Sequence, residues 1–423
     1  MKWVELEELQ REGLRQKVQR ARDVLGRAFE AAERPALAFS GGKDSTVLLD
    51  LVRRFFSRER LARLVVIYGN TGVEYPECVR FSRWLAREWG LDFHEARPGR
   101  TEREGLMYAG QRRVWEWLRG EGRLVEVLKA DGKLKSTLAL ERACPADLRG
   151  ELERERLVWK AGTRQGYWWC ADQYGWPLLG KAWSKLSARR INIDTFLEMS
   201  ESVSEDPKLL AYYEVLREVK ISQHCCDVLK KEPAERVQAE LGVDLILKGL
   251  MASESRTRAI NFLTRGHLFE GAERKYLGGR PFWHCQPMAT WTDEDVWRYI
   301  RRYDVPYADL YDMTYTARDG STQRVKRNGC LGCATDLQFK DNHLFVLRQT
   351  HPRAWRTLMR KGMGVEIRKL QRALRGGGQL TLMDLFSVDE LVDMQPCVFD
   401  DLDGRGGLER PDGGLVYESE DIG

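Results

Sequence analysis

A glycine-rich hexapeptide, Ser40-Gly-Gly-Lys-Asp-Ser45, follows directly on the apolar run Pro35–Phe39 and precedes the helix-like stretch Thr46–Phe56. A loop between a buried strand and a helix start is an anion site, because glycines let backbone N–H groups approach a phosphate closely. Lys43 adds a positive charge, and the two serines add hydroxyl donors. A glycine-rich turn without a ligand is the alternative, and the complete hexapeptide in this context favours a phosphate site.

The segments around this loop alternate between strand and helix. A β-rich run over Leu64–Tyr68 ends in Gly69-Asn-Thr-Gly72, and it is followed by a predicted helix over Pro76–Trp89 and a third strand over Leu91–Ala96. The same alternation resumes with the helix Asp227–Leu241, the strand Asp244–Lys248 and the helix Thr292–Tyr303. This order predicts an α/β fold with a doubly wound, mainly parallel sheet.

Five segments are expected along the chain. Residues 1–34 form an N-terminal helix, 35–97 the nucleotide-binding half of the α/β domain, 98–219 a helical insertion, 220–374 the remainder of the domain, and 375–423 an acidic tail. The insertion contains seven of the fourteen tryptophans, interspersed with arginine and lysine. Residues 381–423 contain twelve acidic and two basic residues, and the tail is expected to be mobile.

Composition narrows the class of protein. Hydrophobic residues make up 43% and charged residues 31%, which excludes a wholly disordered chain. No apolar run reaches the length of a membrane span, and the charged start has no secretory pattern, so a cytoplasmic protein is expected. Residues 1–380 contain 67 basic and 52 acidic residues, and this net positive charge favours an anionic partner such as a nucleotide or nucleic acid. A solvated, arginine-rich surface is the alternative.

Four of the nine cysteines stand in two short pairs, Cys225-Cys226 and Cys330-Leu-Gly-Cys333. Four thiolates from two short segments can hold a tetrahedral zinc ion or a [4Fe–4S] cluster. Spacing alone does not choose between these metals, since the CxxC pattern serves both. Two unrelated pairs of buried cysteines are the remaining alternative.

The hexapeptide resembles the PP-loop of the ATP pyrophosphatases and of the PAPS/APS reductases. Four further segments match: Gly69-Asn-Thr-Gly72 with Glu74-Tyr-Pro-Glu77, Gly249–Arg258, Pro287–Ile300, and Val305–Tyr311. On these segments the chain is similar to the PAPS/APS reductase-like family of the PP-loop, or adenine nucleotide α-hydrolase, superfamily. Asn70 stands where that family usually has aspartate.

The resemblance implies a set of site residues. The phosphates of ATP, or the phosphosulfate of APS or PAPS, would lie on Ser40, Gly41, Gly42, Lys43, Asp44 and Ser45. The rest of the nucleotide would be bound by Asn70, Gly72, Gly249, Arg256 and Arg258. Lys43, Asp44 and Arg256 are the candidate catalytic groups, and Mg²⁺ would bridge the phosphates.

The pattern CC…CxxC is similar to the iron–sulfur signature of APS reductases and of DndC- and SspD-type proteins of DNA phosphorothioation. This resemblance implies a [4Fe–4S] cluster, rather than zinc, on Cys225, Cys226, Cys330 and Cys333. A cluster with four cysteine ligands has no open iron, so the implied role is structural and electrostatic.

Three functions are considered, of which the first is an ATP-dependent sulfurtransferase. Such an enzyme adenylates an acceptor, here nucleic acid, and releases pyrophosphate before a sulfur donor displaces AMP. A partner such as a cysteine desulfurase would supply the sulfur. The first alternative is an APS or PAPS reductase that releases sulfite, for which the acidic surroundings of Cys397 are unfavourable because they disfavour a thiolate. The second is a non-catalytic nucleotide-binding module, which the asparagine at position 70 favours.

Overall fold

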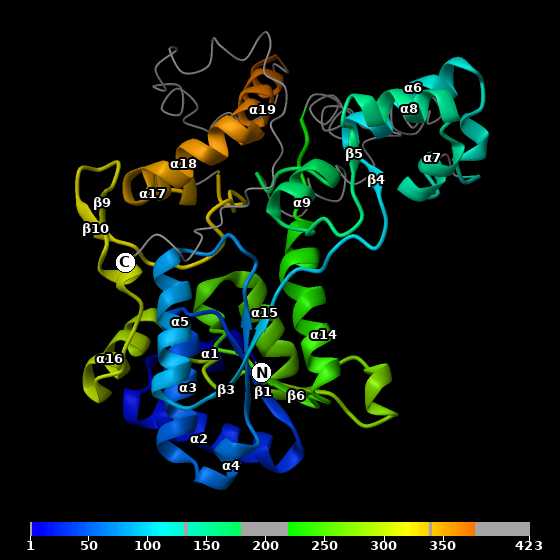
Figure 1. Cartoon of the computed structure of the whole chain (residues 1–423). Helices are drawn as coiled ribbons and strands as arrows, with labels where there is room; N and C mark the ends of the chain where they lie inside the picture. The colour runs from blue at the N-terminus through cyan, green and yellow to red at the C-terminus, as the bar shows by residue number, and fades with distance from the viewer. Residues whose placement is uncertain (1, 131–133, 179–218, 338–340, 377–423) are drawn as a thin grey trace. The chain divides into compact units, whose positions relative to one another are not determined.

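The computed structural model has its central sheet in the region where the sequence predicts alternating strands and helices (Figure 1). It describes residues 2–130, 134–178, 219–337 and 341–376. The chain divides into two compact units, and the first consists of Met1–Arg97, Lys230–Thr314 and Arg324–Cys330. The second consists of Pro98–Leu229, Tyr315–Gln323 and Leu331–Gly423. Residues 220–229 and 331–374 therefore group with the insertion rather than with the sheet.

The first unit is built on a six-stranded sheet with the order β3-β2-β1-β6-β8-β7. Five strands are parallel, and only β7 at the edge runs antiparallel to its neighbour β8. The strands are β1 (Pro35–Phe39), β2 (Val65–Gly69), β3 (Asp92–Ala96), β6 (Leu245–Leu247), β7 (Leu268–Glu270) and β8 (Trp283–Cys285). The predicted mainly parallel α/β fold is confirmed.

Apolar side chains on alternate strand positions bury one face of the sheet against a helix. Ala36, Val65 and Ile246 share this face and pack in one cluster with residues of α14 (Glu232–Glu240). The intervening positions point to the other face, because successive strand residues alternate. There Tyr68 stacks on Phe93 with a centroid distance of 5.9 Å. Because both faces carry apolar side chains, the strands read as nearly continuous hydrophobic runs.

The predicted helices of this unit are present, with shifts of a few residues at their ends. The predicted helices are α3 (Lys43–Phe55), α5 (Pro76–Glu88), α14 and α16 (Asp293–Tyr303). Two further helices were not predicted, α15 (Arg256–Arg265) and the short α4 (Arg58–Ala62). Thr292 caps α16 as predicted, because its hydroxyl accepts a hydrogen bond from the backbone N–H of Asp295 at 3.3 Å.

The prediction of one N-terminal helix is wrong in detail. Two helices occupy this region, α1 (Trp3–Arg11) and α2 (Leu14–Ala31). Gly13 between them is extended, with φ −68° and ψ 153°, and it is the N-cap residue of α2. The apolar positions keep a helical period across the break, so periodicity alone did not reveal it.

The second unit is largely helical in the part that the structure describes. A two-stranded sheet, β4 (Gly105–Leu106) with β5 (Val158–Trp159), lies among α6 (Tyr108–Gly120), α7 (Thr137–Ala143), α8 (Ala146–Arg154) and α9 (Tyr167–Gln173). Three helices follow later in the chain: α17 (His343–Thr350), α18 (Pro352–Leu358) and α19 (Gly364–Gly376). Trp115 is fully buried in the core of this unit. The acidic tail and Trp183 lie outside the described residues.

None of the helices in the described ranges is long and apolar enough to cross a lipid bilayer.

Candidate functional site

The hexapeptide forms the connection between β1 and α3, at the carboxyl end of the sheet. Gly41 has φ +68°, and a Cβ atom there would lie 2.4 Å from Ser82 Oγ and 2.9 Å from the Cys78 carbonyl oxygen. Only glycine satisfies both the left-handed backbone and the close approach to α5. Gly42 is the N-cap residue of α3, and a Cβ atom there would lie 2.6 Å from the side chain of Asn328. The glycines are therefore required by the packing of the loop.

The loop presents backbone donors at the N-terminus of α3. The N–H groups of Ser40 and Gly42 bond to serine hydroxyls within the loop, and that of Lys43 donates to the Tyr311 hydroxyl at 3.2 Å. Among the residues that the structure describes, none accepts from the N–H groups of Asp44 and Ser45. Unsatisfied N–H groups at a helix N-terminus attract an anion, because they combine donors with the positive end of the helix dipole.

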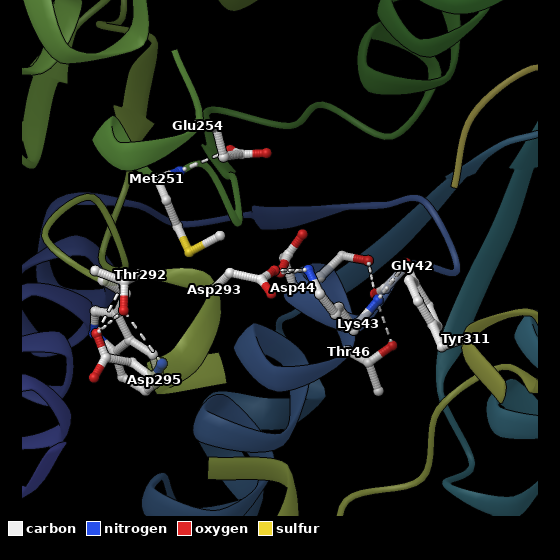
Figure 2. A network of polar contacts seen from close by, with 12 residues as sticks. Gly42, Lys43, Asp44, Thr46, Met251, Glu254, Thr292, Asp293, Asp295 and Tyr311 are labelled. Atoms are coloured by element: carbon white, nitrogen blue, oxygen red, sulfur yellow. Dashed lines mark hydrogen bonds and ion pairs between the residues drawn. The ribbon is translucent and has the colours of Figure 1, made fainter. Parts of the chain in front are cut away.

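Lys43 lies buried beside this helix end (Figure 2). Its Nζ atom is 2.8 Å from Asp44 Oδ1 and 2.7 Å from Asp293 Oδ1, and it lies 5.8 Å from the centre of the Tyr311 ring. Sequence reasoning identified Lys43 and Asp44 as site residues but assigned no role to Asp293 or Tyr311. Both lie in segments that match the family, but these segments are more than 240 positions away from the loop.

Gly249 follows β6 and approaches the same loop. A Cβ atom at this position would lie 3.0 Å from the Asp44 carbonyl oxygen. A glycine is therefore needed for the close packing of this segment on the start of α3. Sequence analysis placed Gly249 in the nucleotide site, and the structure brings it to the phosphate loop.

The two arginines that follow Gly249 differ in their surroundings. Arg256 is the first residue of α15 and is exposed. Arg258 forms an ion pair with Glu254, and burial together with the neighbouring Arg327 lowers its pKa. The carboxylate of Asp44 raises this pKa, because its negative charge attracts the guanidinium group of Arg258. Arg258 therefore lies within electrostatic range of the loop.

Asn70 lies at the carboxyl end of β2, where its amide group bridges two neighbours. Its Nδ2 atom donates to Glu95 Oε2 at 3.0 Å, and its Oδ1 atom accepts from the Gly72 N–H at 3.0 Å. Burial raises the pKa of Glu95, but hydrogen bonds from Arg83, Arg97 and Asn70 outweigh burial and lower this pKa to about 2. The structure therefore gives a local reason for asparagine, since an aspartate would put a second carboxylate beside Glu95.

Replacing Asn70 by aspartate is expected to lower the free energy of unfolding at pH 7 by about 1–2 kcal/mol, because a donor is lost and two carboxylates then repel. This penalty should shrink as the pH falls toward about 4, where one of the two carboxylates takes up a proton. Urea denaturation at several pH values measures it. Asn70→Ala is the control, because it removes the donor without adding a charge. A penalty for Asn70→Asp that stays constant with pH would contradict the explanation.

The four cysteines with metal-ligand spacing are distributed over both units. Cys330 belongs to the first unit, where its Sγ atom lies 3.6 Å from Thr71 Oγ1 and 4.0 Å from Glu74 Oε1. Burial raises the pKa of Glu74, and Lys230 and Thr71 partly offset this effect. Cys225, Cys226 and Cys333 belong to the second unit. Within the described ranges, no three Cys, His, Asp or Glu side chains form a group that could hold a metal ion. The donor set fits a [4Fe–4S] cluster by its chemistry, since four thiolates are its usual ligands.

The other cysteines of the first unit are poor nucleophiles. Burial raises the pKa of both Cys78 and Cys285 to about 12, so both are neutral thiols at pH 7. Cys397, the predicted alternative nucleophile, lies outside the described residues.

Asn328 is a further residue that sequence reasoning missed. Its Nδ2 atom donates to the Ser40 carbonyl oxygen at 2.9 Å, across 288 positions of sequence. It stands two positions before Cys330, so its proximity to a predicted metal ligand was the only signal available.

Comparison with known proteins identifies the family. The sequence profile of the phosphoadenosine phosphosulfate reductase domain matches residues 34–149 and 184–327, more than half of the chain. An adenosine 5'-phosphosulfate reductase from Staphylococcus epidermidis is 30% identical over 114 residues, which cover 27% of this chain and 37% of the relative. One from Neisseria meningitidis is 31% identical over 150 residues, which cover 35% of this chain and 54% of the relative.

The chain thus matches only about a third to a half of the length of these curated relatives. A crystal structure of the phosphoadenylyl-sulfate reductase from Candida auris aligns with a TM-score of 0.31 and 14% identity, over 74% of this chain and 92% of that one. The profile match over both halves of the sheet, together with the loop geometry, leads to one conclusion: this chain belongs to the phosphoadenosine phosphosulfate reductase family.

Proposed function

We propose that this protein is an enzyme that binds the phosphates of ATP on the loop Ser40–Ser45 and transfers AMP to an acceptor. An acceptor oxygen would attack the α-phosphorus, and pyrophosphate would leave with the bonding electrons. A sulfur nucleophile would then displace AMP from the acceptor. The observation that carries this proposal is the start of α3, where two unused backbone N–H groups lie beside the buried Lys43. Such fixed donors stabilise charge on a departing phosphate group.

The chemistry of the cysteines supports ATP rather than a sulfonucleotide as the substrate. A sulfonucleotide reductase needs a thiolate that attacks sulfur, and the described part of the first unit offers three cysteines. Cys78 and Cys285 are buried neutral thiols, and Cys330 is one of the four proposed cluster ligands. The environments of Cys78 and Cys285 do not favour a thiolate nucleophile.

A sulfonucleotide reductase is the second candidate function. It is supported by the family and by the curated relatives, which are named APS and PAPS reductases. In this reading Cys397 would be the nucleophile and sulfite the product.

Two cofactors belong to the proposal. Cys225, Cys226, Cys330 and Cys333 would hold a [4Fe–4S] cluster, which when bound would cross-link the segments that carry these four cysteines. Mg²⁺, when bound with the nucleotide, would neutralise negative charge on its phosphates. Removal of iron by a chelator should therefore lower the rate of pyrophosphate release from ATP.

A nucleic acid is proposed as the acceptor, with a partner protein as the sulfur donor. The support is the positive charge of residues 1–380, which suits a polyanion. The tryptophans of the insertion give less support than the sequence suggested. Trp115 is a core residue, and Trp168 and Trp176 pack on one another at a centroid distance of 5.8 Å.

The deciding experiment uses the protein purified without oxygen and incubated separately with ATP, APS and PAPS. We expect pyrophosphate and AMP from ATP, with a higher rate when transfer RNA or duplex DNA is added. Sulfite from APS or PAPS in the presence of a thiol reductant would support the reductase instead. No product from any nucleotide, with nucleic acid and a cysteine desulfurase present, would refute both enzymatic functions.

A further inference from the structure

Lys43 is held by two carboxylates that come from different parts of the chain. Asp44 is its neighbour in α3, whereas Asp293 is the first residue of α16 (Figure 2). The two ion-pair distances are nearly equal, 2.8 Å to Asp44 and 2.7 Å to Asp293. These three side chains, one ammonium group and two carboxylates, together carry a net negative charge. In this arrangement, an arriving phosphate would meet repulsion from the side chains as well as attraction from the N–H groups.

The two carboxylates differ in how readily they can leave Lys43. The Asp44 side chain is 23% exposed, and its backbone belongs to the first turn of α3. The Asp293 side chain is 60% exposed, so it can turn into water at little cost in solvation. Lys43 itself is only 4% exposed and has no such freedom. Asp293 is therefore the partner that a competing anion can replace.

The backbone that carries Asp293 is firmly anchored. The neighbouring Thr292 donates from its N–H and its hydroxyl to Asp295 Oδ2, both at 2.8 Å. Asp295 in turn forms a buried ion pair with Lys17 of α2 at 2.5 Å. Release of Lys43 by Asp293 consequently requires only a side-chain rotation, because α16 is fixed at this end.

We propose that Asp293 is a positioning residue, a displaceable counter-ion that holds the Lys43 ammonium group until a phosphate of the substrate takes its place. The proposal rests on the phosphate site assigned to the loop under the proposed function. When phosphate binds, Lys43 exchanges Asp293 for the phosphate and keeps its ion pair with Asp44. The buried ammonium group thereby retains two anionic partners throughout the exchange.

The test measures the binding of inorganic pyrophosphate by calorimetry, with EDTA present so that no divalent cation contributes. Asp293→Asn should bind pyrophosphate about fivefold more tightly than wild type, because the competing carboxylate is gone. Glu294→Gln is the matched control. It removes the same charge from the same turn, but Glu294 is paired with Arg298 rather than with Lys43. We expect less than a twofold change for this control.

The same substitution in a Lys43→Met background separates a specific exchange from general repulsion. Without Lys43, the effect of Asp293→Asn should fall to that of the control. An equal gain in both backgrounds would show simple charge repulsion and overturn the proposal, and weaker binding by Asp293→Asn would do the same. Thermal unfolding of each variant verifies that it is folded.

The outcomes also separate this inference from the function on which it rests. If Lys43→Met weakens pyrophosphate binding while Asp293→Asn leaves it unchanged, the phosphate site stands and only the counter-ion role is refuted. If wild type does not bind pyrophosphate at all, the phosphate site itself is wrong, and the inference is refuted with it.

Discussion

Replacement of Lys43 by alanine is expected to reduce pyrophosphate release from ATP by about 10²–10³-fold. The ammonium group is the only basic side chain within ion-pair distance of Asp44 and Asp293 in the described part of the chain. Its loss removes the charge that would neutralise the departing pyrophosphate. It also leaves two carboxylates beside the phosphate site, so repulsion adds to the loss of attraction.

The rate is measured by a coupled pyrophosphate assay, together with the iron content of the purified variant. Iron content should stay at the wild-type value, because none of the predicted ligands contacts Lys43. Lys275→Ala is the control, since Lys275 is an exposed lysine of the same unit. Turnover of Lys43→Ala at the wild-type rate would mean that the reaction takes place elsewhere.

Replacement of Lys17 by methionine is expected to lower the free energy of unfolding by about 3–5 kcal/mol. Lys17 is only 1% exposed, and its Nζ atom lies 2.5 Å from Asp295 Oδ2 and 2.7 Å from the Gln10 carbonyl oxygen. Methionine fills a similar volume but leaves the buried carboxylate of Asp295 without its cation. Urea denaturation followed by circular dichroism measures the change.

Two further variants identify the cause of this destabilisation. Arg11→Met breaks the exposed Arg11–Glu7 pair and should cost no more than about 0.5 kcal/mol. The double variant Lys17→Met, Asp295→Asn removes the stranded charge and should recover part of the lost stability. If the double variant is less stable than Lys17→Met alone, the penalty does not come from an unpaired carboxylate.

The sequence predicted most of the local structure of the first unit, because the signals there are local. The apolar run of β1 was located to the residue, and the cap of α16 was read from Thr292 and the acidic turn after it. The order of the strands was not predicted, since it depends on pairing between distant segments. The break at Glu12 and Gly13 was missed because two extended residues hardly disturb the pattern of apolar positions.

The candidate site was predicted only as far as contiguous motifs reach. The loop residues and Gly249 lie in short, recognisable segments, and the structure brings them together. Tyr311, Asp293 and Asn328 reach the loop through tertiary packing, and no spacing rule connects them with it. The position of Asn70 was evident from the sequence, but its hydrogen bond to Glu95 depends on the pairing of β2 with β3.

The hydrogen bond from Asn328 to the Ser40 carbonyl oxygen has a mechanical consequence. Only Gly329 separates Asn328 from Cys330, and two peptide units span at most about 7 Å. Because this connection is so short, a shift of the Cys330 main chain also shifts Asn328. A change of bonding at the Cys330 sulfur that shifts its main chain must therefore pull on the edge of the phosphate loop. The main-chain position of Cys330 and that of the Ser40 carbonyl group are thus linked through three consecutive residues and one hydrogen bond.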